Sequence, residues 1–259
     1  MKIIVPIKQI LDPSGITVRR DKERIFVNRE DYMVDPGSKA AIEAALQLRA
    51  SDDEVVALSM GRPQADDALR EALAMGCDAA YLLSDESFEE ADVTVTTLIL
   101  AAAINKLDGA DLVITGRQSA DTGAGQIGPR LAEALGYAQV TDVYVLAAAA
   151  GGKVRATRRW AAGYAAVEAS LPAVVTVAPE AFPPRYAHGA RIMNAYRQWQ
   201  VTTWDAADLA LDDAALEPRL AFRSQSFPPP LEIGEQFRGA ATDVAQEVIL
   251  ALKLQKLVG

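Results

Sequence analysis

The chain has 259 residues, of which half are hydrophobic, and it carries a net charge of −9 at pH 7. This acidity argues against nucleic-acid binding, because phosphate backbones require a basic face. The only cysteine, Cys77, excludes an internal disulfide bond, and the longest apolar run, Leu98 to Ile104, is too short to span a bilayer. No signal-peptide pattern opens the sequence. These features predict a cytoplasmic protein without membrane insertion.

Short apolar runs alternate with helical patterns along the first half of the chain. In order, they predict a strand at residues 3–7, an exposed hairpin at 17–27, a helix at 37–50, a strand at 54–59, a helix at 63–75, a strand at 79–83, a helix at 92–107 and a strand at 111–115. Strands that alternate with helices form parallel sheets. The predicted fold class is therefore α/β, with a mainly parallel sheet covered by helices on both faces.

The pattern changes after Val140. Strands are predicted at residues 140–146, 154–160 and 174–177, with a tight turn at 147–152 and a short helix at 187–196. Because no full helices separate these strands, we expect them to extend one edge of the sheet with some antiparallel pairing.

The C-terminal part lacks the periodicity of a second domain. Residues 200–234 contain the run Pro228 to Pro230, which indicates an extended arm, and residues 240–257 have the pattern of an amphipathic helix. An arm that ends in a helix has no core of its own, so it packs either on this domain or on a partner chain. The prediction is an α/β domain over residues 1–199 and a C-terminal arm and helix over residues 200–259.

A glycine-rich run links the strand at residues 111–115 to a helical pattern at residues 130–136. It comprises Gly116, Arg117, Gln118, Ser119, Ala120, Asp121, Thr122, Gly123, Ala124, Gly125, Gln126 and Ile127, followed by Gly128 and Pro129. Glycines let the backbone approach a ligand, and the N-terminus of the following helix favours anions. Such a loop after a parallel strand is typical of nucleotide sites. It has no Walker lysine and no complete Gly-x-Gly-x-x-Gly, so an ordinary strand-to-helix connection is the alternative interpretation.

The sequence offers little material for catalysis or metal binding. His188 is the only histidine and Cys77 the only cysteine, which argues against a zinc site and against a Ser-His-Asp triad. No cluster of carboxylates has the spacing of metal ligands, and no nucleophile–base pair stands out. We therefore predict no catalytic residue and no metal site.

Read together with five other segments in the same order, the glycine-rich run resembles the β subunit of electron transfer flavoproteins. These segments are Val5–Gln9, Asp35–Ala45, Ala72–Asp78, Leu171–Val177 and Pro184–Ala187. Each is weakly specific by itself, whereas their common order is specific. The resemblance covers the first three quarters of the chain.

The resemblance implies an electron carrier subunit rather than an enzyme. The family fold is a nucleotide-binding α/β domain whose C-terminal arm wraps the partner α subunit in a heterodimer. FAD is shared with, or carried by, the α subunit, and electrons pass from flavin dehydrogenases to a quinone-reducing or other acceptor. The alternative is a stand-alone adenine-nucleotide-binding regulator of similar fold, since fold alone does not determine function. A compact regulator does not need residues 200–259.

The resemblance also implies roles for individual residues. Those expected to border the adenine and ribose of a nucleotide are Pro6, Asp35, Pro36, Gly37 and Ser38. Met60 is expected over the adenine, and residues 116–127 are expected to hold the phosphates through backbone amides, with Asp121 and Gln126 as polar members. Without the resemblance, Pro6 and Met60 are interpreted as core residues and Asp121 as a turn or cap residue.

Departures from the family pattern bear on the cofactor. Members that bind AMP usually carry acidic residues after the Asp121 position and a threonine at the Ile127 position, where this chain has Thr122, Gly123 and Ile127. The run Ile127–Pro129 is more similar to members that hold a second FAD and split electron pairs. The nucleotide of this subunit is therefore AMP or a second FAD, and the departures favour FAD slightly.

The segment after Tyr186 corresponds to the family's docking loop for dehydrogenases. Gly189 replaces its usual exposed leucine, and residues 194–199 replace its lysine-rich end. These departures argue against a standard acyl-CoA dehydrogenase partner. Tyr196 and Trp199 are either core residues or exposed anchors for a different partner.

Overall fold

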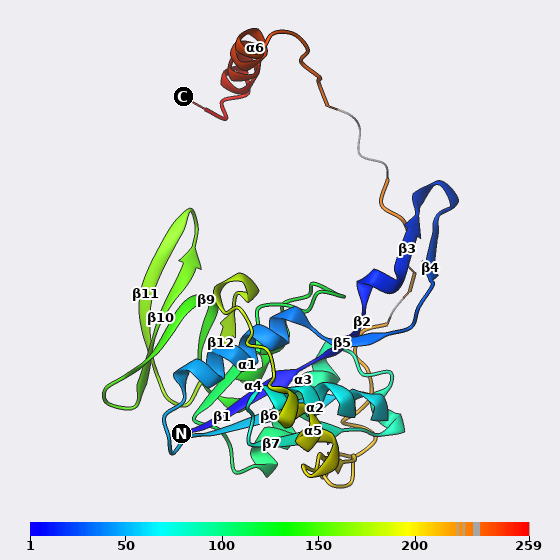
Figure 1. Cartoon of the computed structure of the whole chain (residues 1–259), viewed down its shortest axis with the longest axis vertical. Coiled ribbons are helices and arrows are strands. Elements are labelled where there is room, and N and C mark those ends of the chain that lie inside the picture. Colours follow the sequence, from blue (N-terminus) through cyan, green and yellow to red (C-terminus); the bar gives the residue numbers. More distant parts are fainter. Residues whose placement is uncertain (222, 225, 230–233, 259) are drawn as a thin grey trace. The chain divides into compact units, whose positions relative to one another are not determined.

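The computed structural model describes residues 1–221, 223–224, 226–229 and 234–258 (Figure 1). Its contacts divide the chain into two units. The first comprises Met1–Arg19 and Ile25–Phe222, and the second comprises Arg20–Arg24 and Arg223–Gly259. The α/β fold lies within the first unit.

Within the described residues, nine strands of the first unit form one sheet in the order β11-β10-β9-β12-β8-β1-β6-β7-β13. The strands are β1 (Lys2–Ile7), β6 (Glu54–Met60), β7 (Ala79–Leu83), β8 (Leu112–Gly116), β9 (Ala138–Ala149), β10 (Lys153–Trp160), β11 (Gly163–Ser170), β12 (Ala173–Val177) and β13 (Thr202–Trp204). Neighbours from β9 to β13 are parallel, whereas β10 is antiparallel to β9 and β11. The predicted mainly parallel sheet is confirmed.

Helices cover both faces of this sheet. One face carries α1 (Pro36–Leu48), α2 (Asp66–Met75) and α5 (Gly189–Arg197), and the other carries α3 (Val93–Lys106) and α4 (Ile127–Leu135). Alternate residues of β1 serve the two cores, because Ile3 and Val5 pack on the α1 side and Ile4 packs on the α3 side. All three side chains are fully buried. Each such burial contributes about 1.5–3 kcal/mol to stability.

Signals in the local sequence explain where the first helices begin and end. Asp35 caps α1, because its Oδ2 accepts a hydrogen bond from the backbone N–H of Ser38 at 3.0 Å. Asp92 caps α3 in the same way. Gly76 ends α2 with φ at 144°, which a side chain disfavours. The helix expected over residues 63–75 opens as a short 3₁₀ turn, η3 (Pro63–Ala65), before α2 begins.

Helix α4 begins at Ile127, three residues before the predicted start at Arg130. Pro129 stands in its first turn, where a missing N–H removes no helical hydrogen bond. Gly128 lets the helix lie against the sheet, because a Cβ there would lie 2.2 Å from Cγ2 of Thr176. The last residue of the glycine-rich run is therefore part of a helix N-terminus rather than of the loop.

The three strands expected after Val140 are confirmed as β9, β10 and β12, although β12 lies between β9 and β8 and is parallel to both. The antiparallel edge adds one strand that the sequence does not indicate. Strand β11 pairs with β10 along its whole length. Its composition, with three alanines in eight residues, weakens the alternating pattern that marks a strand. The turn between β9 and β10 is shorter than expected, because β9 continues to Ala149.

Residues 200–222 belong to the first unit rather than to an extended arm. Strand β13 adds to the sheet beside β7, and the Trp204 ring lies 4.5 Å from the Tyr81 ring, measured between centroids. Leu209 and Leu216 are buried in the core on the α3 side. A three-residue strand and two isolated leucines produce no periodicity, which explains why the boundary expected at residue 200 falls inside this unit.

The second unit contains α6 (Ala241–Leu254), where the sequence predicts a closing helix over residues 240–257. None of its described residues is buried, and Ile249, Leu250 and Leu254 expose 50%, 60% and 77% of their surface. Several exposed apolar side chains on one helix are typical of a surface that binds another protein surface.

The described residues also form two small sheets of two strands each. Strands β3 (Ile16–Arg19) and β4 (Arg24–Val27) form the hairpin expected near residues 17–27, and β2 (Gln9–Leu11) pairs with β5 (Tyr32–Val34). In the part of the chain that is described, no helix has the length and hydrophobicity needed to cross a membrane.

The two aromatic residues near the end of α5 differ in exposure. Tyr196 is 56% exposed, with the Arg70 guanidinium 5.4 Å from its ring centroid. Trp199 is partly buried against the core on the α1 side, and the guanidinium of Arg191 lies 4.8 Å from its ring. Trp199 therefore packs on the core, whereas Tyr196 is available at the surface.

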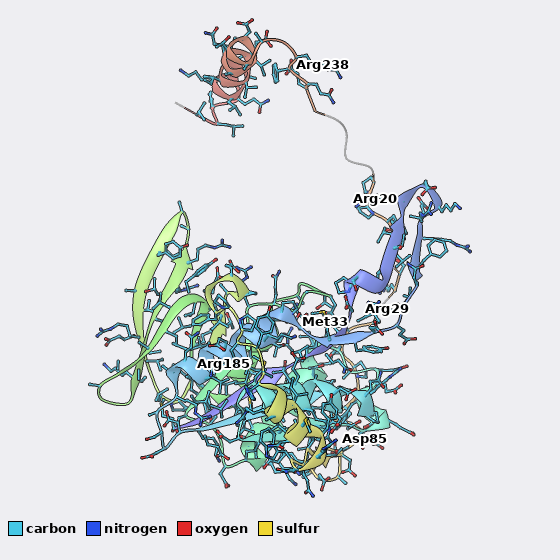
Figure 2. All side chains as sticks on the ribbon, viewed as in Figure 1. Arg20, Arg29, Met33, Asp85, Arg185 and Arg238 are labelled. Atoms are coloured by element: carbon cyan, nitrogen blue, oxygen red, sulfur yellow. The ribbon has the colours of Figure 1, made fainter. Side chains whose placement is uncertain are left out.

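Glu43, buried in α1, anchors the segment before α5. It accepts hydrogen bonds from Arg185 Nε at 2.7 Å, Arg185 Nη2 at 3.0 Å, the Arg185 backbone N–H at 3.1 Å and Gln47 Nε2 at 2.8 Å. Arg185 is labelled in Figure 2. Burial by itself raises the pKa of Glu43, but the hydrogen bonds and charge of Arg185 hold that pKa below its ordinary value.

Replacing Glu43 with glutamine is expected to destabilise the chain by about 1–3 kcal/mol near neutral pH, because the buried ion pair loses its charge. The folded pKa of Glu43 is lowered, so the wild-type advantage is complete above the unfolded value of about 4.3 and is lost as the pH falls through the folded value. Urea unfolding of both proteins across the acidic range measures this. Equal stability at neutral pH contradicts the anchoring role.

Candidate functional site

The strand order reverses direction between β1 and β8. From β1 the chain proceeds through α1 and α2 to β6 and β7 on one side, and then returns through α3 to β8 on the other side of β1. Open parallel sheets bind ligands at such a point, outside the carboxyl ends of the strands. A cavity of about 420 Å³ lies at these strand ends.

Most residues predicted to hold a nucleotide line this cavity. They are Pro6, Asp35, Ser38, Met60, Gly116, Arg117, Gln118, Ser119, Thr122, Ala124, Gly125, Gln126 and Ile127. Five others predicted for the site do not line it, namely Pro36, Gly37, Ala120, Asp121 and Gly123. The sequence interpretation therefore names most of the residues that line the cavity, and the five others lie close by in the sequence without lining it.

Part of the wall is not indicated by the sequence. Ile7, Lys8 and Thr115 come from the strand ends, Ala91 stands two residues before α3, and Val93, Thr96 and Leu100 come from the first eight residues of α3. Ile7 and Lys8 follow Pro6 directly in the segment that resembles the family, which is a usable signal. The α3 residues have none, because their spacing indicates only a buried helix. They supply an apolar wall that suits a flat ring such as a nucleobase.

Asp35 ties three parts of the site together from a buried position. Its Oδ1 accepts a hydrogen bond from the N–H of Ala120 at 2.7 Å, while its Oδ2 caps α1 at Ser38. Its own N–H donates to the carbonyl of Lys8 at 2.9 Å, and the N–H of Lys8 donates to Ser38 Oγ at 3.0 Å. Both carboxylate oxygens are thus engaged by the protein. Asp35 positions the loop against β1 and α1.

The N-terminus of α1 touches the end of β8 through two glycines. A Cβ on Gly116 would lie 2.7 Å from the carbonyl carbon of Gly37, and a Cβ on Gly37 would lie 2.9 Å from the carbonyl oxygen of Gln118. Both distances are shorter than real Cβ atoms make with backbone. Gly37 lines no part of the cavity, but only a glycine at this position lets α1 and the end of β8 approach so closely.

The second half of the loop presents free backbone donors. Among the described residues, the N–H groups of Ala124, Gly125, Gln126 and Ile127 donate to no protein acceptor. Gly123 and Gly125 both have φ at 63°, the left-handed conformation that directs successive N–H groups to one side. Ile127 opens α4, so the partial positive charge of a helix N-terminus adds to these donors. This arrangement favours an anion.

Asp121 stabilises the loop from outside the cavity. Its Oδ2 accepts a hydrogen bond from Lys8 Nζ at 2.5 Å, and its Oδ1 accepts one from the N–H of Thr122 at 2.8 Å. Burial raises the pKa of Asp121, but the hydrogen bonds from Lys8 and Ser119 and the charge of Lys8 lower it overall. The turn interpretation of Asp121 describes its contacts better than a direct ligand role does.

Arg117 is a second charged side chain of the loop that other residues hold in place. Its Nη1 donates to Asp142 Oδ1 at 3.0 Å, Glu180 lies 3.7 Å away, and its backbone N–H donates to the carbonyl of Val177. The hydrogen bond with Asp142 raises the pKa of Arg117, so the guanidinium stays charged. In the described part of the chain, no group of three histidine, cysteine or acidic side chains has the arrangement of a metal site.

Comparison with known proteins agrees with this geometry. A family model described as "Electron transfer flavoprotein domain" matches residues 24–209. The chain is 35% identical to caffeyl-CoA reductase-Etf complex subunit CarD of Acetobacterium woodii, over the full length of both proteins. It is 37% identical to an electron transfer flavoprotein subunit beta of Clostridium acetobutylicum over 83% of each chain. It is 36% identical to protein FixA of Azorhizobium caulinodans over 82% of this chain and 78% of that protein.

The matched region contains the glycine-rich loop and every strand of the nine-stranded sheet except β1, which lies before residue 24. The match to the Acetobacterium woodii subunit also covers the sequence after residue 209. The chain belongs to the electron transfer flavoprotein family and is an electron-transfer β subunit.

Proposed function

We propose that the cavity at the ends of β1 and β8 binds the phosphate and adenosine part of a nucleotide cofactor. The free N–H groups of Ala124 through Ile127 at the N-terminus of α4 carry this proposal. They would donate to phosphate oxygens without any basic side chain. Met60, Val93 and Leu100 would pack on the adenine ring, and Asp35 would hold the loop in place.

We propose FAD rather than AMP as the nucleotide of this subunit. Thr122 and Gly123 stand where AMP-binding relatives are expected to carry acidic residues. The run Ile127–Pro129 is also more similar to members that hold a second FAD. A flavin supplies the electron-accepting chemistry when it is bound, and this chain supplies its binding, its orientation and the surrounding charge.

The proposed physiological role is electron transfer within a heterodimer. Residues 223–259 would pack on an α subunit that shares or carries a further FAD, which gives the exposed leucines of α6 a partner. Electrons would come from flavin dehydrogenases and go to a quinone-reducing or other acceptor. The names of two relatives, the Acetobacterium woodii subunit and the acryloyl-CoA reductase electron transfer subunit gamma of Anaerotignum propionicum, mention CoA-thioester reductases. Such a reductase is a candidate for the redox partner.

Cofactor analysis of the purified complex tests this proposal. Co-expression with the α subunit is expected to yield a yellow heterodimer, and denaturation is expected to release two FAD per heterodimer. One FAD with one AMP supports the simple carrier and rejects the electron-splitting type. Absence of any nucleotide from this subunit rejects the proposed cavity. A stable monomer that binds an adenine nucleotide and no partner supports the stand-alone regulator instead.

A further inference from the structure

One side chain joins the wall of the cavity to the segment that precedes the second unit. Asp92 stands between Ala91 and Val93, which both line the cavity. Its Oδ1 caps α3, while its Oδ2 accepts hydrogen bonds at 2.8 Å from the N–H groups of both Arg219 and Leu220. The second unit begins at Arg223, three residues after Leu220.

The same turn of α3 is connected to the phosphate loop. The Nε of Arg130 donates to Gln126 Oε1 at 3.0 Å, and its Nη1 lies 3.4 Å from Thr94 Oγ1. The N–H of Thr94 in turn donates to Asp92 at 2.8 Å. Hydrogen bonds therefore run from a cavity-lining residue of the loop, Gln126, through α4 and α3 to Asp92.

Up to this point the segment after β13 is fastened to the sheet. Leu209 and Leu216 are buried on the α3 side, and the N–H of Ala206 donates to Asp85 Oδ2 at 3.1 Å. The Asp92 carboxylate is the last of these attachments before residue 223 among the described residues. A ligand that presses on Ala91 and Val93 acts on the turn that holds this attachment.

We propose that Asp92 is a positioning residue that couples occupancy of the nucleotide cavity to binding of the partner subunit by residues 223–259. This inference rests on the proposed function and adds a coupling to it. A nucleotide that orders the first turn of α3 also orders Arg219 and Leu220, so the partner then binds a segment whose attachment to the sheet is already fixed. By thermodynamic linkage, the partner tightens nucleotide binding by the same factor.

Serine and asparagine variants separate the capping role of Asp92 from the coupling. Asp92→Ser keeps an oxygen that caps α3 but lacks the second oxygen for Arg219 and Leu220. Asp85→Ser is the matched control, because Asp85 caps the short turn η4 (Glu86–Phe88), accepts the bond from Ala206 and lines no part of the cavity. Asp85 is labelled in Figure 2. Arg130→Met is a second variant that interrupts the connection on the loop side and leaves Asp92 intact.

The experiment uses the full chain, stripped of nucleotide, with FAD and AMP as probes. Hydrogen–deuterium exchange is expected to slow at the amides of Arg219 and Leu220 when a probe binds. The Kd of the α subunit is expected to fall at least about fivefold with saturating probe, the lower range of known couplings. In Asp92→Ser both effects disappear, in Arg130→Met they weaken, and in Asp85→Ser they persist.

Three results overturn the coupling. They are unchanged exchange at residues 219–220 in the wild type, an unchanged partner Kd with probe, and a coupling that survives in Asp92→Ser. A chain that binds neither probe, or no α subunit, instead rejects the proposed function. If Asp92→Ser does not fold, Asp92→Asn, which keeps one carbonyl acceptor, and Arg130→Met decide the matter by the same two measurements.

Discussion

A valine at position 125 is expected to reduce nucleotide binding at least about tenfold while the sheet stays folded. Gly125 has φ at 63°, and a Cβ there would lie 3.4 Å from the carbonyl oxygen of Arg117. A β-branched residue in this conformation costs about 1–3 kcal/mol, so the loop is expected to turn its N–H groups away from the cavity. Hydrogen bonds to a charged phosphate contribute about 1.5–3 kcal/mol each, which supports a tenfold or larger loss.

Gly151→Val is the matched control for this variant. Gly151 also has a positive φ, at 75°, with nothing within 4 Å of an added Cβ, and it lies in the turn between β9 and β10. It is expected to lower stability while leaving the nucleotide content unchanged. Asp121→Ala is expected to weaken binding less than Gly125→Val, because Asp121 holds the loop through partly exposed contacts. Calorimetric titration with FAD and AMP gives the three values, and normal affinity in Gly125→Val removes the loop as the phosphate site.

Deletion of residues 223–259 is expected to abolish association with the α subunit and to leave a folded α/β unit. The exposed surfaces of Ile249, Leu250, Leu254 and Leu257 amount to 50–77% of each residue. Burying each against a partner is worth about 1.5–3 kcal/mol, so their joint removal is expected to weaken binding more than about a hundredfold. Co-purification and light scattering measure the result, and circular dichroism reports the fold of the shortened chain.

The position of the cut determines whether the deletion tests the interface alone or also the stability of the sheet. A cut at residue 200 also removes β13, Leu209 and Leu216, and is therefore expected to destabilise the sheet itself. A cut at residue 223 spares all three. The double variant Leu250→Asp, Leu254→Asp tests the same surface without any deletion and is expected to weaken association while the chain remains soluble. Association that survives both changes places the main interface on the first unit.

Much of the fold follows from local patterns in the sequence. Ile3, Ile4 and Val5 belong to a strand that is buried on both faces. An unbroken apolar run in the sequence is the pattern that predicts such a strand. The helix caps at Asp35 and Asp92 and the stop at Gly76 are also local signals. The glycine-rich loop is recognisable for the same reason, because the chain needs small residues wherever its backbone closely approaches something else.

Other elements depended on contacts between distant residues. Strand β13 depends on its pairing with β7 and on the contact between the Trp204 and Tyr81 rings. The three residues of the strand contain no pattern that indicates either contact. The apolar residues of α3 line the cavity because the strand order reverses at β1. No local sequence pattern predicts this reversal.

The sequence by itself therefore determined the α/β class, the family and the segment that forms the loop. Only the tertiary structure decided how each residue serves the site. Asp35, expected to border the adenine and ribose, also accepts a hydrogen bond from the loop N–H of Ala120, and Asp121 holds the loop through Lys8 and Thr122. Gly37 lines no part of the cavity but lies against the backbone of Gly116. Asp92 acts at two places, the cap of α3 and the amides of Arg219 and Leu220. The physical reason is that hydrogen bonds and close packing join residues about a hundred positions apart, whereas sequence patterns report only neighbours along the chain.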